Sequence, residues 1–153
     1  MKITEMLRRE FVLEEMKARN KHDALAELAG VFAKGKIKVN PDAMLHVLLE
    51  RERLGSTGIG DGIAIPHGKV HGLDEMVVSF GRSREGIEFE AMDGRPVHLF
   101  FLLMAPENSA GQHLKALAKI SRMLKDPNFR KNLLNAKMHE DLFRSIAEKD
   151  DEC

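Results

Sequence analysis

Five stretches of the chain repeat apolar residues every three or four positions, the spacing that predicts amphipathic helices. The clearest spans about 110–125, where Leu114, Leu117 and Leu124 share one face. Two others follow Asn20 and Asn40, residues that commonly cap helix N-termini. The predicted helices span 21–34, 41–53, 110–125, about 126–134 and 139–148.

Other apolar runs predict strands rather than helices. The run 97–104 is almost continuously apolar, as expected of a central strand buried on both faces. A shorter run, 63–65, ends at Pro66, and further candidates are 11–13, 76–82 and 87–90. Because helical and strand patterns alternate, we predict an α/β fold, a single domain over 1–153 with a mixed central β-sheet flanked by helices.

Composition excludes several function classes. The chain has 153 residues, and its 24 Lys and Arg balance 24 Asp and Glu, so a general nucleic-acid binder is not expected. The longest apolar run, 99–105, is too short to span a membrane, and the N-terminus lacks a signal-peptide pattern. The single cysteine, Cys153, suits a reducing compartment and reads as a tail residue. We therefore expect a cytoplasmic protein without membrane insertion.

A glycine-rich segment, 55–62, joins the second helix to the strand at 63–65. Its spacing fits neither the dinucleotide fingerprint nor the Walker motif, since no lysine is present and a strand follows. What remains is a loop with free backbone N–H groups and the hydroxyls of Ser56 and Thr57. Such a loop can bind an anion, although a plain turn explains the pattern equally well.

His67 follows the strand at 63–65 and the rigid Pro66, which places it just past a strand end, where ligands bind in α/β sheets. Gly68 leaves room beside the ring. The ordinary pKa of histidine, about 6.5, keeps a neutral nucleophilic form available near pH 7. A backbone carbonyl that binds one ring N–H would fix the tautomer. We therefore predict His67 as a candidate for phosphoryl relay, with an ordinary surface histidine as the alternative.

His113 and Arg51 are supporting candidates. His113 lies in the first turn of the helix 110–125, where the helix N-terminus favours negative charge. If the strands at 63–65 and 97–104 are parallel neighbours, His67 and His113 meet at one edge. Arg51, in the last turn of the helix 41–53, matches phosphate oxygens, or simply complements that helix terminus.

The helix 110–125 is also basic, and this feature has two interpretations. Its cations are Lys115, Lys119, Arg122 and Lys125. A solvated face is the simpler reading, and docking to an acidic partner is the alternative.

A metal site is the rival use of the histidines. His67 and His71 form a His-x-x-x-His pattern, which on a helix would place both rings on one face, and His113 would complete the set. Pro66, Gly68 and the following Gly72 argue against a helix there. We expect no metal and no cofactor.

The string Arg-Glu-Arg-Leu-Gly-Ser-Thr-Gly-Ile-Gly-Asp-Gly-Ile-Ala-Ile-Pro-His-Gly-Lys over 51–69 resembles the signature of enzyme IIA domains of the bacterial phosphoenolpyruvate-dependent phosphotransferase system, in the fructose, mannitol and nitrogen-regulatory class. The resemblance implies that His67 is the phosphorylated residue. It places the family's second active-site histidine at His113, and its active-site arginine at Arg51.

The resemblance also implies partners. The donor would be an HPr- or NPr-type phosphocarrier protein, and the target a IIB domain or a regulated kinase or transporter. The Gly-Ser-Thr-Gly-Ile-Gly stretch looks most similar to the nitrogen-regulatory branch, with a sugar-uptake role as the alternative. An interaction module that has lost the phosphoryl chemistry is a further hypothesis.

Overall fold

The computed structural model describes residues 1–153, apart from the side chain of Ala110. One six-stranded mixed sheet organises the chain in the order β1-β5-β6-β3-β2, with β4 also paired to β6. The strands are β1 Val12–Leu13, β2 Gly58–Gly60, β3 Ile63–Ala64, β4 His67–Val70, β5 Val77–Ile87 and β6 Val97–Pro106. The pairs β1–β5, β3–β6 and β4–β6 are parallel, whereas β5–β6 and β2–β3 are antiparallel. The predicted mixed sheet is therefore confirmed.

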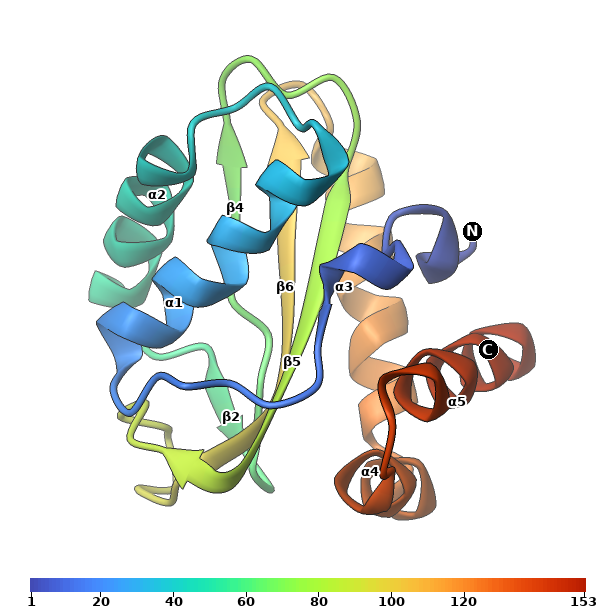
Figure 1. Ribbon diagram of the computed structural model, residues 1–153. Helices are drawn as coiled ribbons and strands as arrows, with labels where there is room; N and C mark the ends of the chain where they lie inside the picture. Colours follow the sequence, from blue (N-terminus) through green and yellow to red (C-terminus); the bar gives the residue numbers. More distant parts are fainter.

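Helices cover both sides of this sheet. They are α1 Lys21–Gly30, α2 Pro41–Arg53, α3 Ala110–Leu124, α4 Pro127–Asn135 and α5 His139–Glu152, with short 3-10 turns at Ile3–Glu5, Arg9–Phe11 and Val31–Gly35. Figure 1 shows α1 crossing in front of the strands with α2 beside it, and α3, α4 and α5 gathered on the other side. No helix among the described residues combines the length and apolar character needed to cross a bilayer.

The sequence predicts the helix starts correctly because their caps are local. The Asn20 Oδ1 accepts from the Asp23 N–H at 2.8 Å, and the Asn40 Oδ1 accepts from the Asp42 N–H at 2.7 Å. The predicted helix 21–34 is shorter as an α-helix, since α1 ends at Gly30 and continues as a 3-10 turn. The last helix is longer than predicted and reaches Glu152.

The predicted placement of His67 beyond a strand end needs correction. Strand β3 ends at Ala64, and the chain resumes as β4 at His67 itself, on the same side of β6. Pro66 cannot donate a ladder hydrogen bond, which explains the break, but its carbonyl accepts from the Leu103 N–H at 2.9 Å. His67 is therefore the first residue of a strand, with a defined side-chain direction.

Two other strand predictions differ from the structure. The segments predicted at 76–82 and 87–90 belong largely to one strand, β5, which contains a register shift between Arg82 and Ile87. The loop 55–62 is also less free than predicted, because Gly58–Gly60 forms β2 against β3. The Gly58 carbonyl accepts from the Met92 N–H at 2.9 Å, so part of the glycine-rich backbone is already bonded.

Candidate functional site

Two histidines from distant parts of the sequence meet at the start of β4. His67 pairs with Leu103 of the parallel strand β6, and α3 begins soon after β6 ends. Side chains alternate along a strand, so His67 and Gly68 point to opposite faces of the sheet. The His67 ring lies edge-on to the His113 ring, with centroids 5.5 Å apart and an interplanar angle of 80°. The predicted meeting of the two side chains is confirmed.

The His67 ring is held in one orientation. Its Nδ1 lies 2.8 Å from the Ile65 carbonyl oxygen, which can only accept, so Nδ1 carries the proton and Nε2 presents a lone pair. Burial lowers the pKa of His67, the bond to Ile65 opposes this shift, and the positive charge of Arg51 lowers the pKa further. The ring is therefore neutral near pH 7, and its free nitrogen is nucleophilic.

His113 is more enclosed than His67. It is buried, and its Nδ1 has no hydrogen-bond partner among the described residues. Burial lowers the pKa of His113, with smaller contributions from His67 and Lys69. An unpaired buried nitrogen costs stability, which makes it a candidate for a bond formed only when a ligand is present. Lys69, to which the sequence reasoning gave no role, adds positive charge beside this ring.

Arg51 lies in the last turn of α2 and lines the approach to His67. Its Nη1 donates to the Gly55 carbonyl at 2.8 Å, which orients the guanidinium. Within the described part of the chain it forms no salt bridge, although its charge acts on His67. The remaining N–H groups of this guanidinium can therefore neutralise an anion brought to His67.

The two loop hydroxyls are placed differently from each other. Thr57 is only 3% exposed, and both its hydroxyl and its N–H donate to the Glu52 carboxylate. Glu52 also pairs with Lys21 at 2.9 Å. Ser56 is half-buried, and its Oγ accepts from the Gly58 N–H at 3.0 Å. The position of Thr57 does not support its predicted role as a phosphate ligand, since its hydroxyl holds the loop against α2.

Replacing Thr57 with valine tests this structural role. The variant should lose about 1–2 kcal/mol of unfolding free energy, because the buried Glu52 carboxylate loses a donor while its shape is filled. Urea denaturation measures the loss. Ser56→Ala serves as the matched control and is expected to change stability by less than about 0.5 kcal/mol. Equal effects in the two variants would contradict the assignment.

Gly68 is explained by packing rather than by access to the ring. A Cβ at this position would lie 2.6 Å from Cγ1 of Val47 in α2. The expectation that Gly68 leaves room beside His67 is therefore wrong. The glycine lets α2 approach β4 closely, which in turn fixes Arg51 relative to His67.

The remaining histidines do not join the site. His71 is exposed, and its Nδ1 lies 2.8 Å from Oε1 of Glu107. The Nδ1 of His98 lies 2.8 Å from the Ser83 carbonyl oxygen, as expected of a satisfied sheet residue. Among the described residues, no group of three or more His, Cys, Asp or Glu side chains is placed to hold a metal ion.

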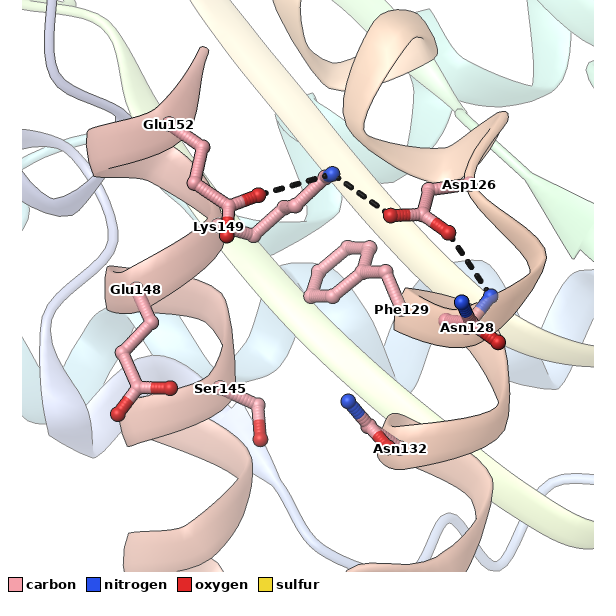
Figure 2. A pocket seen from close by; sticks show the side chains of 8 residues that line it. All are labelled: Asp126, Asn128, Phe129, Asn132, Ser145, Glu148, Lys149 and Glu152. Atoms are coloured by element: carbon pink, nitrogen blue, oxygen red, sulfur yellow. Dashed lines mark hydrogen bonds and ion pairs between the residues drawn. The ribbon is translucent and has the colours of Figure 1, made fainter.

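A separate hollow of about 200 Å³ lies between α4 and α5 (Figure 2). Lys149 bridges it by donating to Asp126 at 2.8 Å and to Glu152 at 3.1 Å, bonds that raise the pKa of Lys149. Asp126 also accepts from the Asn128 N–H at 2.9 Å, which caps α4. The lysine of this hollow is thus already paired, and the hollow contains none of the predicted site residues.

The lowered pKa values of the two site histidines predict a pH dependence. Both rings should stay neutral below 6.5, their ordinary value, because burial disfavours the charged form. The unfolded chain binds these protons more readily, so stability should fall as the pH drops below about 6.5 through the folded pKa values. Titration of the ring resonances by NMR measures the midpoints. A midpoint at or above the ordinary value for His67 would contradict the burial argument.

Comparison with known proteins gives the family. Residues 5–149 match the family described as "Phosphoenolpyruvate-dependent sugar phosphotransferase system, EIIA 2". A nitrogen regulatory protein of Bradyrhizobium diazoefficiens is 42% identical over 147 residues, which cover 96% of this chain and 95% of that protein. The fructose-specific EIIABC component of Bacillus subtilis is 35% identical over 98% of this chain, which spans only 24% of that longer protein.

Solved structures agree with this assignment. The nitrogen regulatory protein IIA-Ntr of Neisseria meningitidis superposes with a TM-score of 0.87 at 32% identity, covering 94% of this chain and 98% of that one. Mannitol IIA of Escherichia coli shares the fold, with a TM-score of 0.77 at 23% identity and coverage of 92% and 98% of the two chains. The chain therefore belongs to the EIIA 2 family of the phosphoenolpyruvate-dependent sugar phosphotransferase system, with nitrogen regulatory proteins among its relatives.

Proposed function

We propose that the protein is a phosphotransferase that accepts a phosphoryl group on Nε2 of His67 from a phosphorylated HPr- or NPr-type carrier and passes it on. The observation that carries this proposal is the bond from Nδ1 to the Ile65 carbonyl, which leaves Nε2 as the free nucleophile. Lowered basicity keeps that nitrogen unprotonated. Phosphoryl transfer asks the protein mainly for such positioning and for neutralised charge.

The transfer needs little movement of atoms. The lone pair of Nε2 attacks the phosphorus of the donor's phosphohistidine, a new phosphorus–nitrogen bond forms, and the donor's bond breaks with its electron pair returning to the donor ring. The proton on Nδ1 stays on the Ile65 carbonyl and delocalises the positive charge that develops on the His67 ring. Arg51 neutralises the equatorial oxygens, and His113 positions them or the His67 ring.

The direction of onward transfer separates two roles. The nitrogen regulatory relatives favour a signalling role, in which the phosphorylation state decides whether the protein binds a regulated kinase or transporter. The fructose-specific relative favours the alternative, transfer to a IIB domain for sugar uptake. A solved complex of mannitol IIA with phosphorylated mannitol IIB from Escherichia coli shows that a IIA protein of this fold can dock a IIB domain. Because phosphoenolpyruvate is made in the cytoplasm, we place the protein there.

The direct test uses the unmodified protein. After incubation with phosphoenolpyruvate, enzyme I and an HPr-type carrier, intact-mass measurement should show one added phosphoryl group. NMR of the histidine rings should place the phosphorus on Nε2 of His67. Unchanged mass with the carrier fully phosphorylated would reject the relay and favour an interaction module without phosphoryl chemistry.

A further inference from the structure

The outward side of α3 forms a continuous surface that begins beside the two histidines. Leu114 is 68% exposed, and Lys115, Arg122 and Lys125 are also exposed. Lys115 and Arg122 are seven residues apart and so lie two helical turns apart on one side. We call these four residues the α3 face.

The α3 face carries cations without counterions. The helix contains no acidic residue, and none of the cations of the α3 face forms a salt bridge with another described residue. Lys119 is different, because it is buried and pairs with Asp150 at 2.6 Å. The expectation that Lys119 belongs to a solvated basic face is therefore wrong, whereas the other three cations remain available.

The charge of the protein is segregated rather than absent. The formal net charge is zero, yet α5 contains six acidic residues against two basic ones, Arg144 and Lys149. Separated patches of this kind steer the approach of a charged partner. The α3 face is thus the side on which a partner of negative charge is favoured.

The position of the α3 face connects it to the reaction. Leu114 and Lys115 directly follow His113, whose ring contacts that of His67. A protein that brings a phosphorylated side chain in line with Nε2 of His67 has to cover the first turn of α3. Leu54, which is 85% exposed, follows the last turn of α2 near Arg51, so an exposed leucine lies next to a site residue on each helix. Such apolar side chains serve as anchors within charged rims.

We propose that the α3 face docks the protein that donates the phosphoryl group, and that this donor presents carboxylate side chains to Lys115 and Arg122. The inference rests on the proposed function and adds the chemistry of the partner. The charges accelerate encounter, Leu114 supplies apolar contact, and His67 carries out the chemistry separately. Changing the cations should therefore affect the encounter and leave the reactivity of the ring unchanged.

The test is the double variant Lys115→Glu with Arg122→Glu, assayed with the phosphorylated HPr-type carrier of the same organism. At low salt its kcat/KM should fall by about tenfold or more, with kcat within about twofold of the unmodified protein. Added salt should reduce kcat/KM less steeply than in the unmodified protein, because less attraction remains to be screened. Phosphorylation by phosphoramidate, a small donor that needs no docking, should proceed within about twofold of the unmodified rate.

The matched control is Lys131→Glu with Lys137→Glu, which makes the same change in charge at exposed positions on α4 and after it. Its kcat/KM should stay within about twofold of the unmodified protein. Equal losses in the two double variants, or a gain in the α3 variant, would overturn the docking proposal. Uptake from phosphoramidate but not from the carrier would also overturn it and leave His67 chemistry in place. Uptake from neither donor would reject the proposed function itself.

Discussion

Replacing His67 with alanine should abolish phosphoryl uptake from the carrier. The loss should be complete because Nε2 of this ring is the atom to which phosphorus bonds, and no other group in the site replaces it. Glutamine at this position should be equally inactive, although it keeps a polar side chain near the Ile65 carbonyl. Intact-mass measurement over time detects the added phosphoryl group directly.

The other histidines provide controls for this experiment. His71→Ala should take up phosphoryl groups at the normal rate, because His71 is exposed and pairs only with Glu107. His113→Ala should lower the rate without abolishing it, since its ring contacts His67 but does not carry the bond. Residual labelling of the His67→Ala protein at the normal rate would show that the phosphorylated residue lies elsewhere.

Replacing Arg82 with methionine should cause the largest loss of stability among single changes outside the site. Arg82 is 1% exposed, and its Nη1 donates to the carbonyls of Leu133 at 2.8 Å and Ala136 at 2.6 Å. Its Nε donates to the Glu14 carbonyl at 3.1 Å. The variant leaves three carbonyls without this charged donor, so we expect unfolding free energy to fall by about 3–5 kcal/mol.

Arg84 offers the matched control for Arg82. Its Nη2 also donates to the Ala136 carbonyl, at 2.9 Å, but its side chain is exposed and water can replace it. Arg84→Met should therefore cost less than about 1 kcal/mol. Urea denaturation of both variants gives the comparison, and equal losses would show that burial of the guanidinium is not what makes Arg82 important.

Comparison of the sequence predictions with the structure separates local from non-local features. The start of α2 was predictable because Asn40 and Pro41 cap and open it through bonds to their own neighbours. The central strand β6 was predictable because a continuous apolar run cannot be satisfied at the surface. The meeting of His67 with His113 could be stated only conditionally, since it required a parallel pairing that periodicity does not reveal.

The errors share one cause, which is that a side chain's neighbours come from other elements. Thr57 reads as a loop hydroxyl, but Glu52 on the preceding helix binds it. Gly68 reads as access to the ring, but Val47 fills the space. Lys119 reads as part of a basic face, but Asp150 of α5 buries its charge. In each case the tertiary contact, rather than the residue type, decides the role.

The sequence by itself determined that a histidine follows a strand, a proline and a glycine-rich segment, and it determined the helices and the apolar runs that surround it, because these depend on residues close in the chain. Only the tertiary structure decided which nitrogen of His67 is free, which ring lies beside it and which cations remain unpaired. Those properties depend on sheet register and on burial, and both arise when distant segments pack together.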